Sequence, residues 1–493
     1  MGENSHGTGP AARSRWGRSK VVRRVGVLGA VLVLAAAVKV AVPVWAASVT
    51  QCAVTDAQTT VSYSSLSAAV SAAAKGNTLQ VVGTCFDPVS VVAPASGIFK
   101  LTIIGETPSG DSGPVLDGSG TGPVLSVGAG VTATVEDLTI TDGSNATGTD
   151  PGGGGVTNAG TLTLDDVTVT GNSSAGDGGG IGNTGTLTLK DGSAVTGNSA
   201  AGDGGGIANL TSGVTTLDGA SSVSGNTATN TGGSGGGVWN SGGATLTMNG
   251  KSSISGNTAI VGGGIWNAGG STVTLNNGSS VASNSAVNGG GIFIGDTTCS
   301  AACLADSVTL NNNSSIADNT ATLDGGGIDN DNPEGSVTLN DNSEVSGNSL
   351  TGEDLPSGAG IFNNGSIALT GSSSIADNNL DIVGIVFGAG VYNSASGTLT
   401  LSGTSSIDGN ITGTHGAGGG VYNAGSVTLG DSSSISDNTA ETGGGIANGG
   451  SVSLNDCSSI TGNSGNGVDD AYGGTLTDSV TGVCDNSGVN INP

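Results

Sequence analysis

One pattern of glycine, apolar and polar positions recurs along most of the chain. It consists of a glycine run, an Ile or Val, one variable residue and then, in most copies, Asn. Copies are 22 to 36 residues apart, a period that indicates a solenoid. The aliphatic residue of each copy is Val156, Ile181, Ile207, Val238, Ile265, Ile292, Ile328, Ile361, Val391, Val421 or Ile446, with a weaker copy at Val468.

Each period contains three short segments in which aliphatic and polar residues alternate, separated by Gly, Asn or Asp. Alternation with a period of two predicts strands, and strands this short satisfy their backbone only by pairing with the same strand one coil away. We therefore predict an all-β fold: a right-handed parallel β-helix with three sheets and about 12 or more coils. The predicted inward residues are Leu162, Leu164, Ile254, Leu275, Ile316, Leu339, Ile407 and Leu429.

A second recurring residue is Asn after Gly or Asp, which we interpret as a stack of turn asparagines that bond from coil to coil. It occurs at Asn172, Asn198, Asn226, Asn257, Asn319, Asn348, Asn378, Asn410, Asn438 and Asn463. The 94 glycines fall in register with these patterns, which favours an ordered solenoid over a disordered glycine-rich chain.

The chain divides into four parts. Residues 1–46 resemble a secretory signal peptide, because basic residues precede the apolar run from Val25 to Val38 and small residues allow cleavage after Ala46. An uncleaved anchor is the alternative, and the export route stays open.

Residues 47–150 are expected to form an N-terminal cap and the first coils, with a short helix within Ser64–Ala74. Residues 151–465 form the repeats and 466–493 a C-terminal cap. We expect a protein that is secreted or associated with the cell surface.

Cleavage changes the charge, because it leaves four lysines, no arginine and 37 acidic residues. Such a chain repels nucleic acid and anionic lipid, so we expect no nucleic-acid binding. No second apolar segment follows the first, so we expect no stable membrane insertion after signal cleavage. A neutral glycan, another cell-surface component or calcium is an easier partner than an anionic polysaccharide. Solubility alone is the alternative explanation for the acidic surface, and the oligomeric state stays open.

Six cysteines in an exported chain favour disulfides. Fifteen pairings are formally open. Proximity in the sequence favours Cys52 with Cys85, Cys299 with Cys303, and Cys457 with Cys484. The outer two pairs would hold the two ends of the solenoid.

The GGG-[IV] phrase followed by Asn resembles the pectin-lyase-like right-handed β-helices, and within them the repeats of polymorphic outer membrane proteins. The resemblance covers residues 150–465. The family's F-x-x-N phrase is replaced here by S-[IV]-x-[GD]-N. The resemblance implies an adhesin-like scaffold at the surface or outside the cell, although enzymes share this fold.

We predict no catalytic residues. Without arginine the mature chain lacks the base of an arginine-dependent lyase, and its adjacent aspartate pairs would face opposite sides of a strand. The densest carboxylates are Asp324, Asp329, Asp331 and Glu334. They predict a weak metal site for calcium or a solvated turn, with a polysaccharide hydrolase as the enzymatic alternative. No other cofactor is expected.

The variable position of the glycine phrase carries six of the mature chain's 11 aromatic residues. Because the aliphatic neighbour faces inward, we expect these side chains to face outward in a stripe that binds glycan, walled by nearby insertions. A self-stacking ladder that stiffens the sheet is the alternative. A third function, binding to ice or another crystal, is suggested by Thr161/Thr163, Thr186/Thr188 and Thr398/Thr400, although these pairs look irregular across coils. The stripe residues are Trp239, Trp266, Phe293, Phe362, Tyr392 and Tyr422.

Overall fold

The structure is a computed structural model of the full chain. It describes residues 51–492 except 94–98, 108–112, 149–151, 231, 296–303, 353–354, 381, 383, 466–467, 470–473 and 480–490. The predicted signal peptide, residues 1–46, and most of the predicted C-terminal cap therefore lie outside the described residues.

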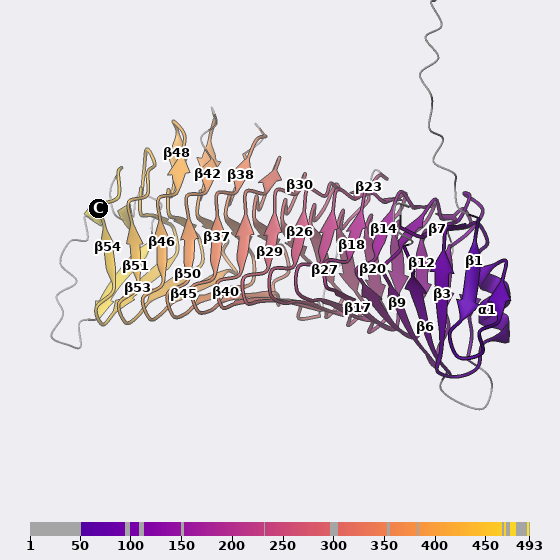
Figure 1. Cartoon of the computed structure of the whole chain (residues 1–493). Helices are drawn as coiled ribbons and strands as arrows, with labels where there is room; N and C mark the ends of the chain where they lie inside the picture. The colour runs from indigo at the N-terminus through magenta and orange to yellow at the C-terminus, as the bar shows by residue number, and fades with distance from the viewer. Residues whose placement is uncertain are drawn as a thin grey trace, which may run out of the picture. The chain divides into compact units, whose positions relative to one another are not determined.

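The described chain forms a right-handed parallel β-helix of about 12 turns, which confirms the predicted fold class (Figure 1). One coil runs through β12 (Val156–Asn158), β13 (Thr161–Asp165), β14 (Thr168–Thr170) and β15 (Ser173–Ser174), and the next coil begins at β16 (Ile181–Asn183). Each strand pairs in parallel with its equivalent one coil away.

Three long sheets result from this stacking. The first has 17 strands, of which β1 (Ala53–Asp56) and β2 (Ser62–Tyr63) are antiparallel additions at the N-terminal end and β56 (Thr475–Ser479) is the last. The second has 14 strands, from β4 (Thr84–Cys85) to β54 (Ser459–Thr461). The third has 15 strands and carries the glycine phrase.

The strands of the 15-stranded sheet are β5 (Val89–Val91), β8 (Leu125–Val127), β12, β16, β20 (Ile207–Leu210), β24 (Val238–Ser241), β27 (Ile265–Ala268), β31 (Ile292–Ile294), β35 (Ile328–Asn330), β39 (Ile361–Asn363), β44 (Val391–Asn393), β49 (Val421–Asn423), β52 (Ile446–Asn448), β55 (Val468–Asp469) and β57 (Ile491–Asn492).

A fourth ladder of two-residue strands, which no alternation pattern predicts, follows the 14-stranded sheet in most coils. It forms a four-stranded group, β11 (Ser144–Asn145), β15, β19 (Ser199–Ala200) and β23 (Thr227–Ala228), and a five-stranded group, β30 (Ser285–Ala286), β34 (Thr320–Ala321), β38 (Ser349–Leu350), β42 (Asn379–Leu380) and β47 (Ile411–Thr412). Isolated bridges through Thr258 join the two groups. Segments of two residues are too short to show an alternation pattern, so only the pairing reveals them.

The core follows the predicted alternation. All eight side chains predicted to face inward are buried. They form one continuous apolar column with the aliphatic residues of the glycine phrase. Burying apolar side chains at every coil is the main stabilising contribution in such a stack.

Two ladders of asparagine run inside the solenoid beside this column. The predicted turn asparagines are joined by Asn284, and each amide Nδ2 donates to the Oδ1 of the next one at 2.9–3.0 Å from Asn172 to Asn463. The asparagines of the glycine phrase form the second ladder, at 2.7–2.9 Å. Ile294 interrupts it and leaves the buried Oδ1 of Asn330 without a partner.

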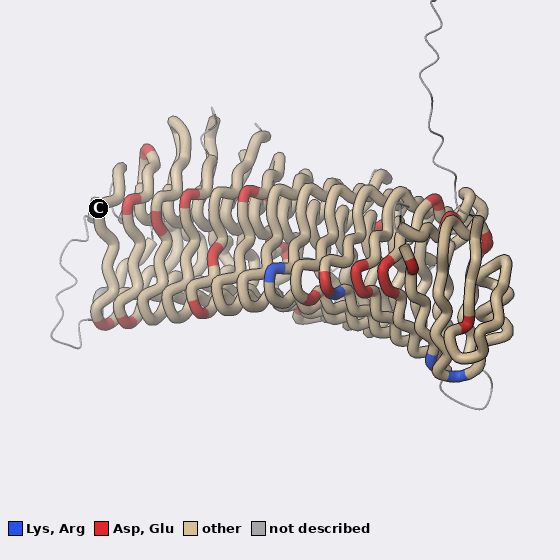
Figure 2. Tube along the Cα trace, in the orientation of Figure 1, with Lys and Arg blue, Asp and Glu red and all other residues tan. Residues whose placement is uncertain are grey.

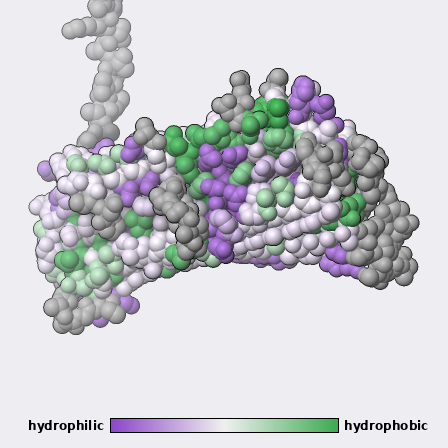
Figure 3. Space-filling view, turned by 180° about the vertical axis from the view of Figure 1, so that it is seen from behind, coloured by the Kyte–Doolittle hydropathy of each residue, from purple (hydrophilic) through white to green (hydrophobic). Residues whose placement is uncertain are grey.

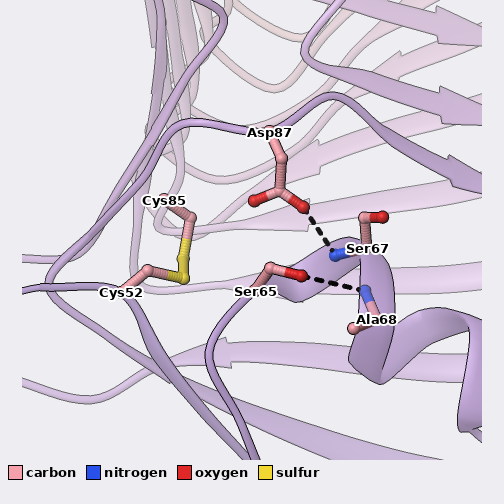
Figure 4. The surroundings of a disulfide bond; sticks show 6 residues. All are labelled: Cys52, Ser65, Ser67, Ala68, Cys85 and Asp87. Carbon is pink, nitrogen blue, oxygen red and sulfur yellow. Dashed lines mark hydrogen bonds between the residues drawn. A yellow bond between two sulfur atoms is a disulfide. The ribbon is translucent and has the colours of Figure 1, made fainter.

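The N-terminal end is closed by helix α1 (Leu66–Ala72), inside the predicted range Ser64–Ala74 (Figure 4). The Oγ of Ser65 accepts the N-terminal hydrogen bond from Ala68 N, and Asp87 accepts one from Ser67 N. Leu66 and Val70 cover the apolar column. The predicted disulfide between Cys52 and Cys85 is confirmed beside this helix.

The remaining cysteines are only partly described. Cys457 is disulfide-bonded. Its predicted partner Cys484 and the predicted pair Cys299 and Cys303 lie outside the described residues. Cationic side chains are scarce along the coils in Figure 2, and the ion pairs within the described part of the chain join Lys190 to Asp165 and Asp191. No described helix has the length and apolar character that crossing a membrane requires.

Candidate binding site on the aromatic row

The six aromatic residues of the glycine phrase lie in one row on the outer side of the 15-stranded sheet. Strand register pairs Trp239 with Trp266 and then Phe293, and it pairs Phe362 with Tyr392 and then Tyr422. Between the two triplets the same register position holds Asp329, paired with Phe293 on one side and Phe362 on the other. We call the six residues the aromatic row and the position of Asp329 its break.

The local sequence explains this placement. In each strand the Ile or Val and the Asn two residues later are buried in the solenoid, so the residue between them points to the opposite side. The parallel register then brings every such residue one coil from the next. A row of like side chains is the direct result of a repeat with a fixed phase.

The row is more buried than the sequence predicts. Trp266 is 9% and Phe293 6% exposed, and the other four rings are partly exposed. Ala268 and Val261 pack against the first triplet, where Trp266 Nε1 also donates to the Gly295 carbonyl at 2.6 Å. Neighbouring segments therefore cover part of the row, rather than only walling its sides.

The rings of the row stack on one another along the solenoid. Trp239 and Trp266 are 5.9 Å apart between centroids, and Tyr392 lies 5.0 Å from Phe362 and 5.2 Å from Tyr422 with nearly parallel planes. Stacking of this kind covers ring faces and presents ring edges outward. The self-stacking alternative is therefore part of the observed geometry, and a ligand meets free ring faces mainly where the stack ends.

One such end lies at the break. Phe362 stacks on Tyr392 through one face, so its other face is turned toward the coil that carries Asp329. Gly325 approaches Asp329 closely, since a Cβ there would lie 2.5 Å from the Asp329 Cα and Cβ. The break therefore places a carboxyl group one coil from the face of Phe362 that does not stack on Tyr392.

Asp329 is 1% exposed, and its contacts are incomplete. Its Oδ2 accepts a hydrogen bond from Asn288 Nδ2 at 3.2 Å, while its Oδ1 is buried without a partner. Burial raises the pKa of Asp329 well above its usual value, and the charges of Asp324 and Asp331 raise it further. The Asn288 hydrogen bond acts in the opposite direction.

Two more carboxylates adjoin Asp329. Burial raises the pKa of Asp324 to about 6, the charge of Asp331 adds to the rise, and a hydrogen bond with the Ser357 backbone opposes it. Burial raises the pKa of Tyr392, and the charge of Asp324 raises it further, so Asp324 also acts on the second aromatic triplet. Asp331 is exposed and accepts a 2.7 Å hydrogen bond from Asn364 Nδ2.

Glu334, the fourth predicted carboxylate, is exposed. Across the described residues, no three or more His, Cys, Asp or Glu side chains are grouped so that they could hold a metal ion. The calcium interpretation therefore gains no support from these positions, and the acidic site at the break consists of Asp324, Asp329 and Asp331.

Projecting loops rise beside the row between the fourth ladder and the 15-stranded sheet (Figure 1). They include β38, β42, β43 (Val386–Phe387) and β48 (Gly416–Ala417), and they pack on a small apolar cluster with Leu350, Leu380 and Val386. Phe387, which sequence reasoning missed, lies 4.7 Å from Tyr422 between ring centroids. Its only signal was its position in the insertion 379–388.

Apolar side chains are exposed on these loops. Leu355 and Ile385 are 59% and 57% exposed. Apolar atoms also gather near the base of the projections in the space-filling view (Figure 3). The row, its break and the loops together form a partly apolar, partly acidic surface on one side of the solenoid.

Known proteins add no identification. No protein-family model, curated protein or solved structure matches this chain.

A second regular surface lies on the 17-stranded sheet. The strand register aligns ten consecutive threonines, Thr78, Thr102, Thr134, Thr163, Thr188, Thr216, Thr247, Thr274, Thr309 and Thr338. A neighbouring row is mostly Thr and Ser. The irregularity expected from the sequence was wrong, because unequal loop lengths hide a register that the strands keep.

Proposed function

We propose that this protein is a secreted or surface-exposed, non-enzymatic β-helix scaffold that binds glycan along its aromatic row. The observation that carries the proposal is the single register position that holds six aromatic residues over seven coils, interrupted only by Asp329. Aromatic rings beside polar groups are the surface on which sugars pack and hydrogen-bond. The exposed apolar loops beside the row supply a wall.

The resemblance to polymorphic outer membrane protein repeats supports the adhesin-like part of the proposal. Both couple a glycine-rich phrase to an Asn in the repeat. A long solenoid offers a repeated surface that suits polymeric ligands, because consecutive coils can contact consecutive units. The acidic, arginine-free mature chain directs the proposal away from anionic polysaccharides.

Intrinsic fluorescence provides a test. If the signal peptide is removed after Ala46, Trp239 and Trp266 are the only tryptophans left, and both belong to the row. We expect hits from a glycan array to change the fluorescence of the mature protein in a saturable titration. Tyr392→Ala should weaken binding, whereas Phe86→Ala, at a 57% exposed ring in the N-terminal part, should not. Unchanged affinity in Tyr392→Ala would remove the row from the proposal.

A hydrolase acting through the carboxylates of the break is the enzymatic alternative. It is favoured by the raised pKa of Asp324, which is the kind of shift a general acid requires. Release of reducing sugar ends from an array hit, lost in Asp324→Asn, would replace the non-enzymatic proposal.

Binding to ice or another crystalline lattice is the second candidate, favoured by the ten aligned threonines on the 17-stranded sheet. Neighbouring coils place these side chains about 4.8 Å apart, which gives a periodic array of hydroxyl and methyl groups. Thermal hysteresis that Thr216→Lys abolishes and Ser255→Lys, on the 14-stranded sheet, leaves intact would support it. Absence of thermal hysteresis in the mature protein would reject it.

A further inference from the structure

The break in the aromatic row holds a buried carboxyl whose hydrogen bonding is incomplete. Asp329 is buried with one carboxylate oxygen unpartnered, and its other oxygen has one amide donor. A buried carboxyl in this condition is costly to ionise unless a cation or further donors reach it. The Oδ1 of Asp329 therefore needs a partner that the described part of the chain does not supply.

The neighbouring groups strengthen this conclusion. The charges of Asp324 and Asp331 both act on Asp329, so a cation that binds at the Asp329 carboxyl is also favoured by these two neighbours, although the three side chains do not converge on one point. The ion pairs of the described residues belong to Lys190, in a different strand of another sheet. The mature chain has no arginine to place there.

The rings that flank the break define the ligand further. Phe293 and Phe362 are the register neighbours of Asp329, and only one face of Phe362 stacks on another ring of the row. Aromatic faces attract cations and also pack against the apolar faces of sugar rings. A ligand that combines a sugar ring with a positive charge would use both features.

We propose that the break binds the protonated amino group of an amino sugar, within a glycan that carries free amines, such as an oligomer of glucosamine. The amino group is placed at the carboxyl of Asp329, with Asp324 and Asp331 as neighbouring charges, and adjacent sugar units lie along the aromatic row. This inference rests on the proposed glycan-binding function and names its ligand class. In this proposal the break is the position at which the protein distinguishes positively charged sugars from uncharged ones.

Calorimetry with two matched oligosaccharides tests the inference. The probes are the β-1,4-linked hexamers of glucosamine and of N-acetylglucosamine, which differ only in the charge and acetylation of the amine. At a pH where the amines are protonated, we expect the glucosamine hexamer to bind the mature protein at least about tenfold more tightly, as charge-assisted hydrogen bonds predict. Raising the salt concentration should reduce that difference only in part, because the site is largely buried.

Three variants locate the effect. Asp329→Asn and Asp324→Asn each remove one negative charge at the break and should lower affinity for the glucosamine hexamer about tenfold or more. Asp137→Asn removes one charge from an exposed turn in an N-terminal coil and is the matched control. Thermal unfolding of each variant shows that the solenoid remains folded, and Asp324, being only partly buried, provides the second variant if Asp329→Asn disturbs packing.

The outcomes separate the two proposals. Equal binding of both hexamers, or equal losses in Asp137→Asn and Asp329→Asn, would reject the amino-sugar site and leave glycan binding by the row intact. Binding of neither hexamer would reject the amino-sugar site. If no glycan on the array binds either, the proposed function also fails.

Discussion

At the scale of single residues, the buried asparagine ladders are the most demanding feature of this solenoid. Asn319 shows why: its Nδ2 donates to Asn348 Oδ1 and to the Val281 carbonyl, and its Oδ1 accepts from both the backbone and side-chain nitrogens of Asn284. Both polar atoms of this buried side-chain amide form hydrogen bonds, and each bond joins Asn319 to a neighbouring coil. Removing one amide therefore leaves partners unsatisfied on both sides.

Asn319→Ala tests this dependence. We expect the free energy of unfolding to fall by about 2–4 kcal/mol, because a cavity and several unsatisfied buried groups are created together. Denaturant unfolding measures the change. Ser432→Ala, at an exposed turn, should change the stability by less than about 0.5 kcal/mol. A loss of the same small size in Asn319→Ala would show that the ladder adds little.

The buried carboxyl of Asp329 makes the stability of the protein depend on pH. Its pKa in the folded state is raised above the unfolded value, so its contribution to stability is most favourable at pH below about 4 and declines as the pH rises through the folded pKa. Asp324, with a folded pKa of about 6, acts in the same direction. Asp329→Asn should therefore raise the melting temperature at pH 7 and have little effect near pH 4. An equal shift at both pH values would contradict the assignment.

The buried apolar column and the turn asparagines were predictable from the sequence, whereas the burial and raised pKa of Asp329 were not. Because side chains alternate between the two faces of a strand, the alternation of apolar and polar residues determines which side chains enter the core. Whether an outward residue is exposed depends on loops from other coils, which have no period. Phe293 and Asp329 are covered for this reason, and Phe387 reaches Tyr422 from an insertion with no repeat signal.

At the scale of elements, the glycine corner between the fourth ladder and the 15-stranded sheet sets how closely the coils approach. Gly263 shows the constraint, because a Cβ there would lie 2.5 Å from the carbonyl oxygens of Gly290 and Ser285. Both are backbone atoms of the next coil, so neither can move without shifting the stack. The regular spacing of the glycine runs therefore has a steric cause.

Gly263→Ala should accordingly destabilise the protein severely, by more than about 3 kcal/mol, because the clash involves backbone rather than a flexible side chain. Gly232→Ala is the matched control, since a Cβ at that position meets no atom within 4 Å. Thermal unfolding of the two variants gives the comparison. Similar melting temperatures would show that the corner relaxes more easily than the structure implies.

The N-terminal cap is the second element with a clear consequence. The disulfide between Cys52 and Cys85 closes a separation of 33 residues beside α1, which corresponds to about 3–4 kcal/mol of unfolded-state entropy. In a solenoid each coil contacts only its neighbours, so the effect should stay local. Replacing both cysteines by serine should speed amide exchange in β3 (Asn77–Val82) and leave β45 (Thr398–Leu401) unchanged. Equal acceleration in both strands would indicate a fully cooperative solenoid instead.

At the scale of the whole molecule, the two regular outer surfaces differ in chemistry. The 17-stranded sheet presents small hydroxyl side chains of one kind, whereas the 15-stranded sheet presents stacked rings, an acidic break and projecting loops. Loops of variable length beside a rigid scaffold are where binding function concentrates in folds of this kind. This asymmetry is why we place the ligand on the aromatic side.

The sequence predicted the two rows with different success. The aromatic row was recognisable because rare residue types share one position of a strong phrase. The threonine row was not, because Thr is common in strands and the loops between copies vary in length, so the register appears only when strands are paired.

The most direct test is the position of a bound oligosaccharide in a crystal structure of residues 47–493 with a glycan that binds on the array. We predict a sugar ring in contact with Phe362 next to Asp329, with further units along Tyr392 and Tyr422. A ligand bound on the threonine row of the 17-stranded sheet, or at either end of the solenoid with the aromatic row empty, would contradict it.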